Sequence, residues 1–392
     1  RVALDRLLAE HAFLTVQALE AGITDDDQFA AAAAAHEANT AELEGAIADI
    51  YDATAGERFG DLWRAHIGYV VDYTRATQAG DEAAEQSAVE ALDAYQDEFV
   101  AFLSEANPRL SAETLHHLLE DHLGQLQQVA KLQAGDYEAV YDTARSAYGH
   151  MFELGDGLAR GISEQFPSRF SGRGVAFGPA FDLQLSLDRL LGEHAFFAVE
   201  VMRLADGEPA HQRAASDALA SNGRSLSEAI GEIYGEEAGR AFAEIWEEHN
   251  GYYVDYVRAA LDGDESAADI ARAGLETFSD RASRFFAEAN DQLDREAVRS
   301  GLAAHTEHLV QQVEAHAAGD YAASFAIGRE AHAHMGAVSN LLATGIAKQF
   351  PTQFLPDTAV RPTSLTTVIG WLLVAVAIGA LLRAMVTGGR QP

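Results

Sequence analysis

The chain has no cysteine, and it has few prolines and very few lysines. Without cysteine there are no disulfides, no thiolate metal ligands and no cysteine nucleophile. Only eight prolines occur among 392 residues, and no segment shows the sustained alternation of polar and apolar residues that marks a strand. A helical period is present instead, because Leu4, Leu8, His11 and Leu14 fall on one helix face. The sequence therefore predicts an all-α protein.

Basic residues are scarce as a class. Lysine and arginine together number 27 against 61 acidic residues, which gives a formal net charge of −34. Affinity for nucleic-acid phosphates requires clustered lysine and arginine. The composition of this acidic protein therefore excludes nucleic acid as a partner.

The sequence repeats once along its length. The segment from Arg6 to Phe13 returns almost unchanged from Arg189 to Phe196, and residues 63–73 return in part as residues 246–256. We therefore expect two tandem homologous domains, residues 1–170 and 184–354, joined by a linker over residues 171–183. We call them the first and the second copy.

A shorter period lies within each copy. His11, His66 and His122 follow one another at nearly equal intervals, and His194, His249 and His305 repeat these intervals. A Gly-Asp pair follows the histidine at a similar distance in several units, at residues 80–81, 135–136, 263–264 and 319–320. Glycine ends a helix in the left-handed region and aspartate caps the next one. Each unit is therefore predicted to be an αα-hairpin, and each copy to be a bundle of three hairpins.

The C-terminal region predicts a membrane anchor. After a short stretch over residues 355–364, the segment from Leu365 to Leu382 carries no charge, and its length can cross a bilayer core of about 30 Å. We expect a transmembrane helix over residues 365–385 and a tail over residues 386–392. Arg383 and Arg390 follow the apolar stretch, which favours a cytoplasmic tail and a protein whose bulk lies outside the cytoplasm. The alternative is a cytoplasmic protein that is anchored by this C-terminal helix. The first residue, Arg1, is typical of a chain from which a signal peptide has been removed.

Histidines at matched positions are the candidate chemistry of the chain. Three of them hold the same place in three successive hairpins of each copy, so a threefold packing of the hairpins would bring them together. A fourth comes from the second helix of the third hairpin. The predicted ligands are His11, His66, His122 and His150 in the first copy and His194, His249, His305 and His334 in the second copy. Neutral imidazoles bind copper and zinc well, so we hypothesise one copper or zinc ion per domain.

Carboxylates near these histidines are candidates for further ligands or for partners of the ligands, and they are Glu10, Asp72, Glu193 and Asp255. The matched Asn39 and Asn222 are predicted to be buried amide partners. The histidines that occur in one copy only are predicted to lie on the surface, and they are His36, His116, His117, His211, His308, His316 and His332.

Other interpretations of the same residues stay open. The matched histidines can be hydrogen-bonded core residues, in which case the protein is a structural or accessory subunit of a membrane complex. A buried histidine layer can also act as a pH switch, and the aromatic stripe at Trp63, Tyr69 and Tyr73 can line a ligand pocket. The common nucleophile, nucleotide-binding and zinc-protease motifs are absent from the sequence, which gives no support for an enzyme and indicates no catalytic residue.

Several motifs together resemble a known family. They are Gly135-Asp136-Tyr137, His150-Met151 and Gln165-Phe166-Pro167, with the Trp63-to-Tyr73 segment before them. They resemble secreted all-helical repeat proteins of Gram-positive bacteria, some of which are labelled copper amine oxidase N-terminal domain proteins. The resemblance covers both copies. It implies an extracytoplasmic helical protein, and it implies no particular activity.

The possible partners are a membrane protein or a second copy of the chain.

Overall fold

The computed structural model describes residues 1–354 except residues 25, 134 and 171–177. Within these residues there are fourteen helices and no strand, so the all-α prediction is confirmed. The helices of the first copy are α1 (Val2–Thr24), α2 (Asp26–Ile50), α3 (Ala53–Ala79), α4 (Glu82–Ala106), α5 (Ala112–Leu132), α6 (Tyr137–Gln165) and α7 (Pro167–Phe170). Those of the second copy are α8 (Pro179–Arg203), α9 (Pro209–Tyr234), α10 (Glu236–Asp262), α11 (Glu265–Ala289), α12 (Arg295–Ala317), α13 (Tyr321–Gln349) and α14 (Pro351–Phe354).

The order of the helices follows the sequence repeat. Each copy has six long helices and one short C-terminal helix, and α3 matches α10 in length, at 27 residues each, as α6 matches α13, at 29. Residues 1–354 form one compact unit in which both copies take part. The domain boundaries given above remain a prediction. The helix α8 already begins at Pro179, within the segment expected to be linker.

The Gly-Asp pairs end one helix and begin the next, as predicted. Gly80 and Gly263 end α3 and α10 with φ of 65° and 70°, where a side chain would be strained. Asp81 and Asp264 then accept hydrogen bonds from backbone amides of the following helix. Because these residues recur at the same place in both copies, the second hairpin of each copy has the same turn.

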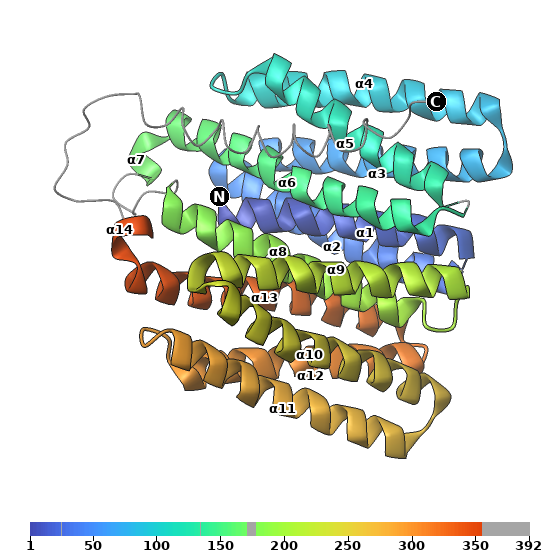
Figure 1. The fold of residues 1–392 in the computed structure, drawn as a ribbon. Coiled ribbons are helices and arrows are strands. Elements are labelled where there is room, and N and C mark those ends of the chain that lie inside the picture. The colour runs from blue at the N-terminus through green and yellow to red at the C-terminus, as the bar shows by residue number, and fades with distance from the viewer. Residues whose placement is uncertain (25, 134, 171–177, 355–392) are drawn as a thin grey trace, which may run out of the picture. The chain divides into compact units, whose positions relative to one another are not determined.

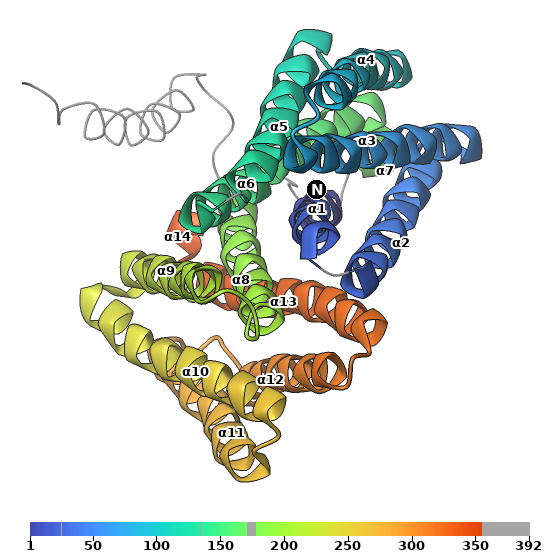
Figure 2. The ribbon, with the colours of Figure 1, turned by 90° about the vertical axis from the view of Figure 1, so that its right-hand side faces the viewer.

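The two copies pack through their first, second and last long helices. In Figures 1 and 2, α1, α2 and α6 face α8, α9 and α13, whereas α3, α4 and α5 lie on the far side of the first copy and α10, α11 and α12 on the far side of the second. The closest contacts between copies join α2 to α13 and α6 to α9. As a result, α1 is buried on almost all sides, including the face that carries Leu4, Leu7, Leu8 and Leu14.

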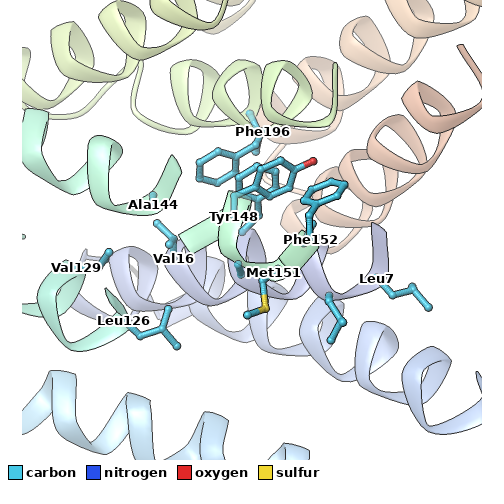
Figure 3. Close-up of a cluster of buried hydrophobic side chains, with 14 of the residues drawn as sticks. Leu7, Val16, Leu126, Val129, Ala144, Tyr148, Met151, Phe152 and Phe196 are labelled. Carbon is cyan, nitrogen blue, oxygen red and sulfur yellow. The ribbon is translucent and has the colours of Figure 1, made fainter. Parts of the chain in front are cut away.

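Aromatic rings fill the centre of the contact between copies. The ring of Phe13 on α1 is stacked between two others, with its centroid 3.8 Å from that of Phe196 on α8 and 3.9 Å from that of Tyr148 on α6. Figure 3 shows Tyr148, Met151 and Phe152 on one helix of this cluster of buried side chains, with Phe196 on another helix. Phe13 and Phe196 are equivalent positions of the repeat, so they lie where the two copies meet symmetrically.

Matched ion pairs cross the same contact. Arg329 of the second copy binds Glu10 of the first at 3.0 Å, and Arg145 of the first copy binds Glu193 of the second. The two ion pairs are equivalent, because Glu10 matches Glu193 and Arg145 matches Arg329 in the repeat. Removing one partner would leave a buried carboxylate unpaired, which is the costly way to break such a pair.

A third polar contact between copies is not symmetric. Arg203 donates to Glu200 at 3.0 Å and lies 3.4 Å from Glu20, while Gln17 donates to Glu200 at 3.0 Å. Positions 17 and 200 are equivalent, as are 20 and 203, yet they carry complementary side chains. Glu200 is fully buried, and its burial raises its pKa to about 8. The side chains at these equivalent positions are therefore complementary between the first and the second copy, whereas two first copies or two second copies would not match in this way.

No helix among the described residues is long and apolar enough to cross a membrane. The predicted transmembrane helix, residues 365–385, lies outside the described residues, as do the flanking segments 355–364 and 386–392 and residues 171–177 of the predicted linker. The membrane anchor stays a prediction.

Candidate metal centre

Three histidines of each copy meet at one point, as the hairpin spacing predicts. In the first copy His11 comes from α1, His66 from α3 and His122 from α5, and these three helices contact one another. In the second copy α8, α10 and α12 bring His194, His249 and His305 together in the same way. Each histidine is on the first helix of its hairpin, so the threefold repeat of hairpins creates the cluster. We call these the first and the second histidine cluster.

The spacing of the rings suits a metal ion. In each cluster one nitrogen from each ring lies within 4.8 Å of the other two. The Nε2 atoms of His11 and His66 are 3.3 Å apart, as are those of His194 and His305. Ligand nitrogens at about 2.0–2.1 Å from a tetrahedral zinc ion stand roughly 3.3 Å apart. The residues of both clusters can therefore hold a metal ion with small ring movements.

The close pair is not the same in the two clusters. In the first cluster His11 of α1 approaches the ring on α3, whereas in the second cluster His194 of α8 approaches His305 on α12. His305 is the equivalent of His122, not of His66. The three rings of the second cluster are nearly equidistant, with centroids 5.3–5.8 Å apart. The histidine on the first helix of each copy, His11 or His194, therefore approaches a different neighbour in each cluster.

The clusters are buried and uncharged. All six side chains are at most 2% exposed. Burial disfavours the imidazolium form, so it lowers the pKa of His122 to about 3 and holds the pKa values of the other five well below their usual range. Neighbouring rings lower these pKa values further. The imidazoles are therefore neutral at pH 7, which is the form that binds a metal ion.

Most ring nitrogens in the clusters lack a partner. Neither nitrogen of His122 or His249 makes a hydrogen bond to another described residue, and the Nδ1 atoms of the remaining four rings make none either. Near His66, the backbone carbonyls of Leu62 and Trp63 raise its pKa against the larger effect of burial. Buried polar atoms are normally paired, so four unpaired nitrogens at each cluster are an unusual feature.

Aromatic rings form the walls. Trp63 lies 4.6 Å from His11 and 4.7 Å from His66, centroid to centroid, and Trp246 holds the same place beside His194 at 4.8 Å. His249 stacks on Phe278 at 4.0 Å. Of the predicted aromatic stripe, only Trp63 lines the histidine cluster. Tyr73 is buried and donates a hydrogen bond to Glu85, and Tyr69 is only partly buried.

Two predicted ligands, His150 and His334, do not join the clusters. His150 Nε2 is 2.7 Å from the carbonyl oxygen of Leu118, and His334 Nε2 is 2.8 Å from that of Gly301. Each imidazole thus bridges the two helices of the third hairpin of its copy. For this pair the structural interpretation of a matched histidine is the better one.

The carboxylates predicted near the clusters have other roles. Glu10 and Glu193 are buried, but they accept hydrogen bonds from Asn39 and Asn222 and bind the arginines of the opposite copy. The two asparagines are fully buried and also donate to backbone carbonyls, as predicted. Asp72 and Asp255 are exposed on α3 and α10. The metal-ligand groups found among the described residues contain histidine alone.

The prediction that unmatched histidines lie on the surface is right for His117 but wrong for His36 and His332, and His116 is partly buried. His36 is 2% exposed on α2; its Nε2 is 2.9 Å from Thr15 Oγ1, and its ring stands edge-on to His11 at 4.7 Å. His332 is 7% exposed and lies 3.3 Å from the Tyr148 hydroxyl, between the copies. The sequence did hold a signal for the burial of His36, because His36 lies one helical turn before Asn39, which is predicted to be buried, and so shares its helix face. The remaining three are partly buried, and they are His211, His308 and His316.

The two clusters differ at their borders. The equivalents of His36 and Tyr95 in the second copy are Leu219 and Phe278. Tyr95 stacks on His66 at 4.9 Å, and its buried hydroxyl has no partner among the described residues. The first cluster therefore has a fourth imidazole and a phenol nearby, whereas the second has only apolar groups there.

Comparison with family models, with curated proteins and with solved structures gave no significant match for this chain. The resemblance to secreted helical repeat proteins stays a prediction.

Proposed function

We propose that this protein binds two transition-metal ions, one in each histidine cluster. The observation that carries the proposal is the convergence of three neutral, fully buried imidazoles, found twice at matched positions, most of whose nitrogens have no other partner. Each unsatisfied buried polar atom costs about 1–3 kcal/mol. A metal ion accepts one nitrogen from each ring and leaves the other free to donate to a nearby carbonyl after a small rotation.

The charge of the site favours a particular ion. The clusters contain no thiolate and no carboxylate, so nothing in them neutralises a bound cation. The desolvation cost of an ion grows with the square of its charge, and it is large in a buried site. Monovalent copper bound by three imidazoles fits this environment best, and divalent zinc or copper would require a fourth, anionic ligand from outside the cluster.

The competing function is a purely structural one. In that case the pair of rings at 3.3 Å is a hydrogen bond between neutral imidazoles, and the protein is an accessory subunit of a membrane complex. The bonds of His150 and His334 to backbone carbonyls are of this structural type. The three-ring clusters differ from them because most of their nitrogens remain unpaired.

The location of this metal binding is part of the proposal. The uncharged stretch of residues 365–382 and the arginines after it support a membrane-anchored protein whose helical bulk lies outside the cytoplasm. Such a protein would handle metal at the cell surface, where a buried site exchanges its ion slowly because the bundle must open locally.

Metal analysis of the full chain tests the proposal. The protein is purified in detergent without chelators or nickel resin, reloaded with Cu⁺ under reducing conditions or with Zn²⁺, and desalted. We expect two equivalents of one metal per chain. Replacing His122 or His305 with leucine should each remove one equivalent, and replacing both should remove all metal.

The chain offers a matched control. His150 and His334 are histidines of the same copies that bind carbonyls, so leucine at these positions should leave two equivalents bound. Less than one tenth of an equivalent after reloading, or equal metal loss from the control variants, would contradict the proposal and favour the structural function.

A further inference from the structure

The second copy carries a groove at a place where the first copy is filled by its own side chains. The groove runs between α9 and α10, has a volume of about 720 Å³, and has Gly223, Gly231 and Gly239 along its floor and Trp246 at one side. The floor is low because the two helices approach closely: a Cβ on Gly239 would lie 2.8 Å from the backbone oxygen of Ser227. This groove is separate from the second histidine cluster, which lies behind Trp246.

In the first copy an arginine of the protein lies at the equivalent place. Arg64 binds Glu37 at 2.8 Å and Glu44 at 2.9 Å, and the Arg64 and Glu44 side chains lie directly over Gly60. A Cβ on Gly60 would be only 2.7 Å from the Arg64 guanidinium. The first copy thus fills its groove with its own guanidinium group, held between two carboxylates.

All three of these side chains are changed in the second copy. Glu247 replaces Arg64, Ala220 replaces Glu37 and Ser227 replaces Glu44. The cation has gone, and its place is open. The charges that remain are mainly negative: the carboxylates of Glu228, Glu232, Glu236 and Glu247 face the groove, against two arginines. One of these, Arg240, already lies beside Glu236.

Unpaired polar atoms beside the groove point to an occupant as well. The one that distinguishes the second copy is on Asn250, because Ile67 stands at its place in the first copy, whereas Trp63 Nε1 lacks a partner just as Trp246 Nε1 does. The Trp246 side chain is 2% exposed, and its Nε1 has no hydrogen-bond partner among the described residues. Its edge faces Gly223 on the groove floor, because a Cβ there would lie 3.0 Å from Cδ1 and 3.7 Å from Nε1. The side-chain oxygen of Asn250, which also lines the groove, lacks a partner too.

We propose that this groove binds a small organic cation, a molecule with a guanidinium or ammonium group and a short body that carries a hydrogen-bond acceptor. The cation lies near Glu247, where the first copy holds its own guanidinium, and the body lies over the glycine floor beside Trp246. The proposal is independent of metal binding, since none of these residues belongs to a histidine cluster.

Calorimetry on the metal-free full chain in detergent tests the proposal, with N-acetyl-L-arginine amide as the probe and its neutral isostere N-acetyl-L-citrulline amide as the comparison. We expect one site per chain for the arginine probe and binding at least about tenfold weaker for the citrulline compound, since a charged hydrogen bond is lost. No heat from the arginine probe at millimolar concentration, or equal affinity for the two compounds, would overturn the proposal.

The repeat supplies the variants. A quadruple variant of the second copy, Ala220→Glu, Ser227→Glu, Ala243→Gly and Glu247→Arg, copies the closed arrangement of the first copy without changing the net charge, and it should lose binding at least tenfold. The change at Ala243 is needed because the equivalent Gly60 leaves room for Glu44 and Arg64. The reverse variant, Glu37→Ala, Glu44→Ser and Arg64→Glu combined with Thr40→Gly and Ala48→Gly to give the glycine floor, should open a second site and raise the stoichiometry to two. Unchanged binding by the closing variant would place the probe elsewhere and overturn the proposal, and circular dichroism checks that both variants fold.

Discussion

Acidification should destabilise the metal-free protein strongly and early. Eight histidines are buried and have pKa values lowered by burial, namely His11, His36, His66, His122, His194, His249, His305 and His332. Below pH 6.5 the unfolded chain protonates these rings, but the folded protein does not, because burial lowers the pKa of His36 to about 4 and those of His122 and His332 to about 3, and holds the other five well below 6.5. The stability that these neutral histidines contribute to the folded protein is therefore fully present above pH 6.5, and it is lost as the pH falls below 6.5.

The size of the effect follows from linkage. Between pH 7.5 and 5.5 each of these histidines lowers the free energy of unfolding by about 1.4 kcal/mol, or about 11 kcal/mol for the set. Three buried acids act in the opposite direction, because burial raises their pKa values to about 8 for Asp5, about 8 for Glu200 and about 6 for Asp188. These acids take up protons in the folded state over the same pH interval, which raises the free energy of unfolding by about 6 kcal/mol. The net loss is about 5 kcal/mol, comparable with the whole stability of many domains.

Urea unfolding followed by circular dichroism, at intervals between pH 7.5 and pH 5.5 in the presence of a chelator, measures this loss directly. We expect the free energy of unfolding to fall by several kcal/mol, with the steepest fall below pH 6.5. With metal bound, the ligated nitrogens cannot accept protons until the ion leaves, so the same fall should begin at a lower pH. A free energy of unfolding at pH 5.5 that equals or exceeds the value at pH 7.5 would refute the assignment of these histidines as buried and neutral.

Three further outcomes follow from individual positions. Tyr95→Phe removes a buried hydroxyl without a partner among the described residues, so the metal-free protein should gain about 1 kcal/mol in urea unfolding, whereas the reverse change Phe278→Tyr in the second copy should lose a similar amount. Gly239→Ala should cost at least about 2 kcal/mol, because its Cβ would meet backbone atoms of α9, and Gly251→Ala on the same helix, with nothing within 4 Å, should gain about 0.5–1 kcal/mol. Saturating metal should raise the free energy of unfolding by about 4 kcal/mol for each site at a thousandfold excess over the dissociation constant, or about 8 kcal/mol for the two sites, and a shift below about 1 kcal/mol would argue against the clusters as tight sites.

The local features of this fold could be predicted from the sequence. The helical period, the Gly-Asp ends and the regular interval from one matched histidine to the next are all properties of one hairpin, and they repeat. A repeated hairpin stacks on its neighbours in the same way each time, which is why the convergence of His11, His66 and His122 could be expected.

Contacts between distant segments could not be predicted in this way. The partner of Glu10 is Arg329, near the other end of the described chain, and no periodicity within a helix indicates which copy supplies it. The sequence also could not separate His150 from the cluster histidines, because a ring that bridges two helices through a carbonyl has the same apolar neighbours as a ligand. The prediction for His36 fails because a histidine that is absent from the second copy need not be exposed: Leu219 is buried at the equivalent position.

X-ray absorption at the metal edge of the loaded full chain tests the central claim most directly. Our account predicts about three nitrogen scatterers per ion at roughly 2.0 Å, with the outer-shell pattern of imidazole and no sulfur, and it predicts the loss of half the signal when His122 alone is replaced with leucine. A shell made mainly of oxygen, or a spectrum that the His122 and His305 replacements leave unchanged, would contradict it.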